Sequence, residues 1–175
     1  ELVEGSKGNT PRHKDACLAV SLGTVGYSRA LELQRRLHRQ VAEGALPDLL
    51  LLLEHPHVYT LGRRGQDSDV LESERTLARL GVEIHRTDRG GEVTYHGPGQ
   101  LVGYPIVDLR RWGGGPLAYV QALEDSLVAT LRTFGIRAQS GAKPTGVWVD
   151  EAKIAAIGVK ISRRITMHGF ALNVA

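Results

Sequence analysis

The sequence is poor in sulfur, with one cysteine, Cys17, and one methionine, Met167. A single cysteine excludes an intramolecular disulfide and leaves no cysteine set for a zinc site, and it favours a reducing, cytoplasmic setting. Long apolar runs are also missing. The longest strongly apolar run, from Leu49 to Leu53, is far too short to cross a bilayer, and no signal peptide precedes it. We therefore expect no membrane association.

Charge of one sign is also scarce. Lys and Arg number 22 and Asp and Glu number 19, which gives a net charge of +3 with neutral histidines. This excess is too weak to indicate a nucleic acid partner, and it is compatible with an acidic protein partner. With 42% hydrophobic and 23% charged residues, the 175-residue chain fits one globular domain rather than a disordered or collagen-like chain.

The element pattern indicates a flexible N-terminal arm over residues 1–15 and one domain over residues 16–175. Apolar residues at helical spacing, bounded by Gly or Pro, predict helices at Tyr27–Glu43, Ser73–Leu80 and Pro116–Phe134. Short apolar runs predict strands at Ala16–Leu22, Leu49–Leu53, Val58–Leu61, Val82–Arg86, Gln100–Val107, Ile136–Gln139, Gly146–Val149, Lys153–Ile161 and Ile165–Val174. We expect an α+β fold with two layers, in which a mixed sheet carries its helices on one face and Leu49–Leu53 is buried on both faces.

The densest group of glycines lies between Arg89 and Gln100 and forms the first candidate site. Glycine lets a backbone approach a ligand closely, Arg89 could hold an anion, and His96 could donate a hydrogen bond or move a proton. The alternative is a connection of two turns with a surface arginine and a core histidine. The segment is no nucleotide fingerprint, because its glycines lead into a strand rather than into a helix.

Three other residues are weaker candidates. Lys153 begins a strand in which partial desolvation would lower its pKa, although a solvated hairpin lysine is the better interpretation from these residues alone. His168 lies in the last strand and could be catalytic or structural. Cys17 lies in an apolar strand, where a buried cysteine acts as a small hydrophobe rather than as a nucleophile. No second cluster at metal-ligand spacing accompanies His55 and His57, so we expect no metal.

Taken together, these segments resemble the lipoyl(octanoyl) transferase family. The matching strings run in order along the chain: Leu53-Glu54-His55-Pro56 with Tyr59-Thr60-Leu61-Gly62-Arg63, the long string from Arg89 to Ile106, Gly146-Val147-Trp148, Lys153 to Val159, and His168 to Val174. The resemblance implies the fold of the biotin and lipoate protein ligase catalytic domains. It also implies transfer of an octanoyl group from acyl carrier protein to a lysine of lipoyl domains, in 2-oxoacid dehydrogenases and the glycine cleavage H protein, through a cysteine thioester and without cofactor or metal.

The resemblance also implies which residues act. Lys153 matches the lysine that lowers the pKa of the nucleophilic cysteine and assists proton transfer. The acyl site would be lined by three segments: Arg89, Gly90, Gly91, Glu92, Val93, Thr94, Tyr95 and His96; Ala156, Ile157 and Gly158; and Gly169, Phe170 and Ala171. Amides of the glycine-rich loop could stabilise the oxyanions of both transfer steps.

The sequence departs from the family pattern at its end. The nucleophilic cysteine of the family follows the Leu-Asn-Val segment, here Leu172 to Val174, and this chain stops at Ala175. Since the chain also begins at Glu1 without an initiator methionine, we expect a trimmed polypeptide whose acyltransferase domain is incomplete at its C-terminal end. We therefore assign the activity to the parent protein. The alternatives are an ATP-dependent lipoate or biotin ligase-like enzyme and a non-catalytic homologue that binds carrier protein.

Overall fold

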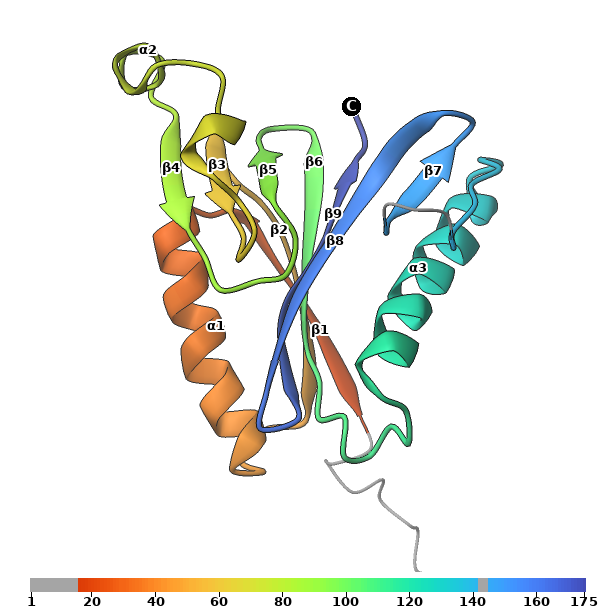
Figure 1. Cartoon of the computed structure of the whole chain (residues 1–175). Helices are drawn as coiled ribbons and strands as arrows, with labels where there is room; N and C mark the ends of the chain where they lie inside the picture. The colour runs from red at the N-terminus through yellow and green to blue at the C-terminus, as the bar shows by residue number, and fades with distance from the viewer. Residues whose placement is uncertain (1–15, 142–144) are drawn as a thin grey trace, which may run out of the picture.

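Two β-sheets organise the computed structural model, which describes residues 16–141 and 145–175 (Figure 1). The arm expected at residues 1–15 lies outside the described residues. The larger sheet has six strands in the order β1 (Cys17–Thr24), β2 (Asp48–Glu54), β6 (Gln100–Ile106), β9 (Ile165–Asn173), β8 (Ala152–Ser162) and β7 (Val147–Val149). The smaller sheet has the order β4 (Glu83–Arg86), β3 (Val58–Leu61) and β5 (Val93–His96). Each sheet combines parallel and antiparallel pairs, which confirms the mixed pairing, but the strands form two sheets where the sequence predicts one.

Local signals explain where the helices begin and end. Helix α1 (Tyr27–Ala42) is the crossover that the parallel pair of β1 and β2 requires, and Gly44, with a φ of 73°, follows its end. Helix α2 (Glu74–Arg79) is capped by Ser73, whose hydroxyl accepts from the amide of Thr76 at 3.1 Å. Helix α3 (Pro116–Thr133) starts on its proline. No helix among the described residues is long and apolar enough to cross a membrane.

The prediction that the helices share one face of the sheet is wrong. Helix α1 packs on the face formed by Val102 and Ala171, whereas α3 packs on the opposite face with Leu101 and Leu172 (Figure 1). These residues are neighbours within β6 and β9, so they point in opposite directions. Both faces of the central strands are apolar, and each therefore needs a helix to cover it.

The edge near β1 is less covered than the sequence suggests. Along β2 buried residues alternate with half-buried ones, because α3 contacts β7 and β8 at the other edge of the sheet. Leu49–Leu53 is therefore buried on one face only. Cys17, expected to be buried, is exposed on the edge strand β1. The strand predicted at Ile136–Gln139 is reduced to one bridge between Gln139 and Trp148.

Three glycines let the central strands β6, β8 and β9 approach one another closely. Gly158 in β8 lies opposite Gly169 in β9. A Cβ atom on Gly169 would lie 2.2 Å from the carbonyl oxygen of Gly103 in β6, and one on Gly103 would lie 2.2 Å from the Phe170 ring. Neither position can hold a larger residue without moving the backbone or that ring. The strands consequently enclose a space where side chains would otherwise fill the core.

Candidate active site

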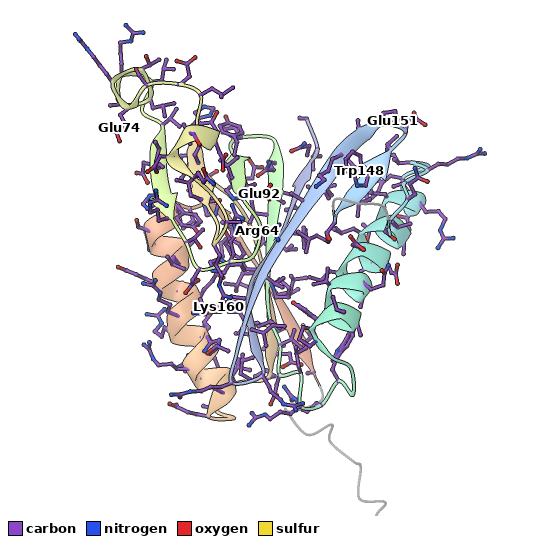
Figure 2. The ribbon with its side chains drawn as sticks, viewed as in Figure 1. Arg64, Glu74, Glu92, Trp148, Glu151 and Lys160 are labelled. Carbon is purple, nitrogen blue, oxygen red and sulfur yellow. The ribbon has the colours of Figure 1, made fainter. Side chains whose placement is uncertain are left out.

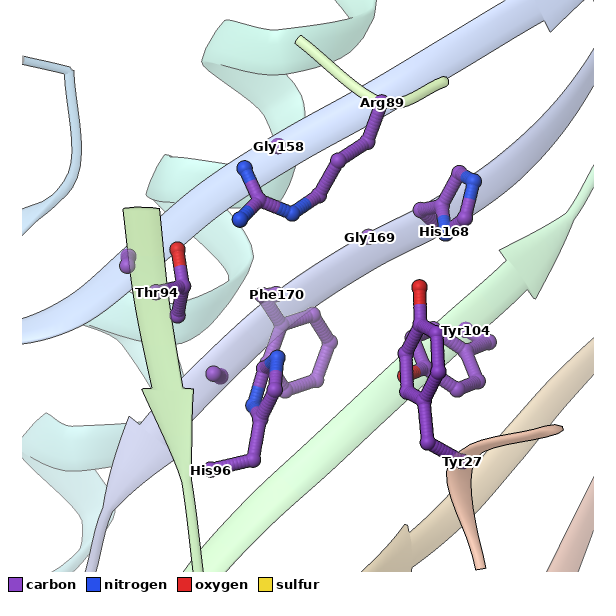
Figure 3. A pocket seen from close by; sticks show the side chains of 11 residues that line it. Tyr27, Arg89, Thr94, His96, Tyr104, Gly158, His168, Gly169 and Phe170 are labelled. Carbon is purple, nitrogen blue, oxygen red and sulfur yellow. The ribbon is translucent and has the colours of Figure 1, made fainter. Parts of the chain in front are cut away.

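A narrow hollow lies between these glycines, the N-terminus of α1 and the β5 strand of the smaller sheet (Figure 3). The cavity itself measures only about 20 Å³, and it lies within about 320 Å³ of atom-free space that includes open solvent. The lining combines one cationic side chain with neutral polar, aromatic and small residues: Tyr27, Arg89, Thr94, His96, Tyr104, Ala156, Gly158, His168, Gly169, Phe170 and Ala171. Such a lining suits an apolar chain with one polar end.

Arg89 supplies the cation of the hollow. Only 7% of the residue is exposed, and burial lowers the pKa of its guanidinium. Its Nη2 donates to the carbonyl oxygen of Thr60 at 2.6 Å and to the Thr60 hydroxyl at 2.9 Å, while Nη1 donates to the carbonyl of Gly90 at 2.9 Å. No carboxylate of the described residues forms an ion pair with it. A buried cation held only by neutral acceptors favours a ligand that brings negative charge or a polarised carbonyl.

His96 faces the hollow as a neutral acceptor. Burial lowers its pKa to about 4, against a smaller opposing effect of the Gln100 hydrogen bond. The imidazole Nδ1 lies 2.7 Å from Gln100 Oε1, which can only accept, so the network assigns the proton to Nδ1. The other nitrogen, Nε2, lies 3.4 Å from the Thr60 hydroxyl and keeps a lone pair. At neutral pH His96 can therefore accept a proton or a hydrogen bond from a ligand.

His168 closes the hollow from β9, and an ionic pair holds it in place. Its Nε2 donates to Asp88 at 2.9 Å, and the ammonium of Lys160 donates to the other carboxylate oxygen at 2.6 Å. Burial by itself raises the pKa of Asp88, but the hydrogen bonds from Lys160 and His168 outweigh it and bring the pKa to about 2. Burial lowers the pKa of His168. The result is a neutral imidazole whose orientation is fixed by a carboxylate.

Two tyrosines complete the wall and come from elements far apart in the sequence. The Tyr104 hydroxyl donates to Nε2 of His55 at 2.7 Å, and the other nitrogen of His55 donates to the carbonyl of Val25 at 2.6 Å. The Tyr27 hydroxyl, which Figure 3 shows directed into the hollow, makes no hydrogen bond of good geometry among the described residues, although Thr87 lies near enough to lower the pKa of this hydroxyl against the effect of burial. Burial raises the pKa of both phenols. Tyr27 is thus a protonated donor available to a ligand.

Eight of the fourteen residues predicted to line an acyl site line this hollow: Arg89, Thr94, His96, Ala156, Gly158, Gly169, Phe170 and Ala171. Gly90, Gly91, Glu92, Val93, Tyr95 and Ile157 do not. Strand alternation explains three of these six exceptions, because Val93 and Tyr95 point away from the side of Thr94 and His96, and Ile157 packs toward α3. Glu92 pairs with Arg64 at the surface (Figure 2).

Three lining residues fall outside the predicted set. Tyr27 carries no local signal, since only the tertiary fold brings the start of α1 to the hollow. Tyr104 lies inside the string that resembles the family and could have been found by extending the set along β6. His168 was a candidate on sequence grounds, without an assigned role.

Lys153 does not line the hollow. Its ammonium donates to the carbonyl of Thr145 at 2.9 Å and lies 5.2 Å from the centre of the Trp148 ring, on the β7–β8 hairpin seen at the upper right of Figure 2. Ala155 pairs with Leu172, so Lys153 lies two residues farther, toward the end of β9. The lysine and the hollow therefore share β8 but are separate features. No group of three or more potential metal ligands occurs among the described residues.

The sequence and the fold are both similar to those of known proteins. The family described as the lipoyl protein ligase A/B catalytic domain matches residues 26–175. An octanoyltransferase of Solibacter usitatus is 54% identical over 91% of this chain, which spans 72% of that protein. An octanoyltransferase of Arabidopsis thaliana, described as mitochondrial, is 47% identical over 87% of this chain and 66% of its own length.

Solved structures agree on the fold. A putative lipoate protein ligase from T. acidophilum superposes with a TM-score of 0.68 at 16% identity, over 89% of this chain and 67% of its own. A P. falciparum protein crystallised with lipoate superposes with a TM-score of 0.70 at 14% identity, over 90% of this chain and 48% of its own. These structures confirm the expected fold, and the sequence match places the chain among the octanoyltransferases, within the lipoyl protein ligase A/B catalytic domain family.

Proposed function

We propose that the hollow around Arg89 and His96 is the octanoyl site of an octanoyltransferase. The observation that carries this proposal is the character of the lining. Apolar atoms form most of the wall, and the single cation, Arg89, is buried without a carboxylate among the described residues. An alkyl chain could lie along the glycines of β8 and β9, with its carbonyl directed toward the donors of Arg89 or Tyr27.

The reaction would proceed in two acyl transfers. A cysteine thiolate attacks the carbonyl of the octanoyl thioester on acyl carrier protein, a new carbon–sulfur bond forms, and the carrier thiolate leaves. The neutral lysine amine of a lipoyl domain then attacks the enzyme thioester, a carbon–nitrogen bond forms as the carbon–sulfur bond breaks, and the proton lost by the amine passes to the departing sulfur, which leaves as the cysteine thiol. Exchange between thioesters is nearly balanced and amide formation is downhill, so no nucleotide is needed.

Cys17 does not suit the role of nucleophile. It lies outside the hollow, and partial burial of its thiol, followed by the nearby carboxylate of Asp48, raises the pKa of that thiol. A raised pKa leaves less thiolate at neutral pH. We assign the nucleophile to the cysteine that the family resemblance expects after Leu172 to Val174, in the parent protein. Lys153, located toward the same end of β9, would favour its thiolate by charge.

The partners follow from the reaction. The donor is octanoyl acyl carrier protein, and the acceptors are lipoyl domains of 2-oxoacid dehydrogenases and the glycine cleavage H protein. We place the reaction in the cytoplasm because the single cysteine suits a reducing compartment.

Mass spectrometry tests the assignment of the nucleophile. The 175-residue chain mixed with octanoyl acyl carrier protein should gain no thioester adduct, whereas the parent protein should gain one octanoyl group and pass it to a lipoyl domain without ATP. An adduct on Cys17 would contradict the assignment. Release of pyrophosphate by the parent protein in an ATP-dependent reaction would replace the transferase by a ligase.

Binding measurements test the hollow itself. Arg89→Gln should weaken octanoate binding to the 175-residue chain, measured by calorimetry, by about tenfold or more, since a charge-assisted hydrogen bond contributes about 1.5–3 kcal/mol. The thermal midpoint of the Arg89→Gln protein should fall by less than that of a variant in which a buried core side chain is truncated to alanine. Unchanged octanoate affinity in a folded Arg89→Gln protein would remove Arg89 from the site.

A further inference from the structure

A second surface, separate from the hollow, gathers several arginines of one helix. An open groove with about 1,440 Å³ of atom-free space, including solvent, lies between the edge strand β1 and helix α1. Four arginines of α1 line it, Arg29, Arg35, Arg36 and Arg39, together with one acid, Glu32. Their sum, four minus one, is +3, which equals the formal net charge of the whole sequence. The remaining charges of the chain therefore balance.

The side chains of these four arginines are exposed. Within residues 16–141 and 145–175, none of the four side chains makes a hydrogen bond or an ion pair, not even with Glu32. Some surface cations among the described residues hold a carboxylate, as Arg64, Arg86 and Lys160 do, whereas Arg75 and Arg79 on α2 share the unpaired state of the α1 arginines. A row of unpaired like charges along one helix has no stabilising role within the fold.

The floor of the groove is apolar. Leu22, Val25 and Leu33 line it between the strand and the helix. Leu18 and Val20 project from the same side of β1 as Leu22, by strand alternation, and are 45% and 39% exposed. An exposed apolar strip on an edge strand, bordered by arginines, has the composition of a docking surface for a protein partner that is both acidic and partly apolar.

The groove and the hollow meet at the start of α1. Val25 and Gly26 line the groove, and the next residue, Tyr27, lines the hollow. Arg35 of the groove is close enough to Tyr27 to contribute to lowering the pKa of its hydroxyl, against the dominant effect of burial. A protein bound along the arginines would therefore lie next to the acyl site.

We propose that this groove, defined by Leu22, Val25, Arg29, Leu33, Arg36 and Arg39, docks the acidic face of the protein that delivers the acyl group. The proposal rests on the proposed function for the identity of the donor. Positive potential along α1 steers an acidic carrier toward the enzyme and orients it, and the apolar floor holds it once bound. The acyl thioester of a carrier docked here would reach the hollow past Tyr27.

Charge reversal on the exposed face of α1 tests the proposal. Binding of acyl carrier protein to the 175-residue chain is measured by fluorescence anisotropy in 50 mM and 300 mM salt, with the double variant Arg36→Glu/Arg39→Glu. The matched control is Arg75→Glu/Arg79→Glu on α2, which changes the net charge equally at two exposed arginines. We expect at least a tenfold rise in Kd for the α1 variant and less than a twofold change for the control. Wild-type binding should weaken steeply at 300 mM salt.

Several outcomes would overturn the docking site. Equal losses in both double variants would show attraction by net charge alone. The proposal would be rejected if the α1 variant bound acyl carrier protein with wild-type affinity, or if the wild-type chain did not bind it at all. It would also be rejected if sedimentation showed that the α1 substitutions dissociate a dimer of this chain rather than a complex with acyl carrier protein. The proposal would likewise be rejected if the α1 variant lost binding to a short DNA duplex while its affinity for acyl carrier protein stayed unchanged. Octanoate binding, measured in parallel, should be unaffected by either double variant. Failure of the groove is thereby distinguished from failure of the acyl site.

Discussion

The buried histidine of the hollow makes the stability of the protein depend on pH. His96 has a pKa of about 4 in the folded protein because burial disfavours its charged form, whereas an exposed histidine titrates near 6.5. Between these two values the unfolded chain binds more protons than the folded one. The stability that the neutral His96 contributes is therefore fully present above pH 6.5 and is lost as the pH falls toward 4.

The size of this loss follows from the two pKa values. For a group with a folded pKa of about 4 and an unfolded pKa of about 6.5, linkage gives a loss of about 2 kcal/mol between pH 7 and pH 5, and about 3 kcal/mol by pH 4. His55 and His168 are shifted in the same direction by burial and add to this loss. A domain with a total stability of about 5–15 kcal/mol would register it clearly.

Urea unfolding, followed by the fluorescence of Trp112 and Trp148, measures the effect at pH 7, 6 and 5. The free energy of unfolding of His96→Gln should fall with pH about 2 kcal/mol less than that of the wild type over this range. His57→Gln, the same substitution at an exposed histidine outside the hollow, serves as the matched control. A wild-type slope in His96→Gln would refute the reasoning, because it would mean that His96 is not held neutral by burial.

Three other substitutions probe the hollow and its neighbour. Gly158→Ala should abolish octanoate binding in calorimetry and lower the thermal midpoint, because a Cβ there lies 2.9 Å from the Gly90 carbonyl, whereas Gly115→Ala faces open space and should do neither. Tyr104→Phe should cost about 1–3 kcal/mol in urea unfolding, since it leaves Nε2 of the buried His55 without its donor, and Tyr59→Phe should cost much less. Lys153→Ala in the parent protein should raise the pKa of the nucleophilic thiol and slow acyl transfer, and an unchanged rate–pH profile would reject that role for Lys153.

The helices were the most predictable elements because their signals are local. Apolar spacing, Pro116 and the flanking Gly44 and Gly135 place the ends of α1 and α3 within a residue or two of the observed ones. The sequence does not predict the strand β5, because its four residues stand between glycines in a segment with the pattern of a loop. What makes it a strand is pairing with β3, with Thr60 opposite Thr94, a contact that no local pattern reveals.

The site was predictable as three segments but not as a surface. A segment in a strand contributes alternate residues to each face, so Thr94 and His96 reach the hollow while Tyr95 bonds to His57 on the other side, at 2.5 Å. A string of residues that resembles the family does not distinguish the residues that face the hollow from those that face away from it. The contribution of Tyr27 depends on how α1 packs against the sheet, and sequence spacing gives no information on that packing.

Backbone strain at His168 connects these observations to the shape of the site. His168 has a φ of 57°, a conformation that costs a non-glycine residue about 1–3 kcal/mol and persists only where its surroundings require it. Here the buried side chain of Gln34 accepts from the His168 amide at 2.8 Å, and Asp88 holds the ring. The amide is thereby withdrawn from the β6–β9 ladder, whose continuous pairing stops at Gly103 and Phe170. Replacing His168 by glycine would relieve the strain but release Asp88, so the same residue distorts the strand, closes the hollow and links it to the ion pair that orients its wall.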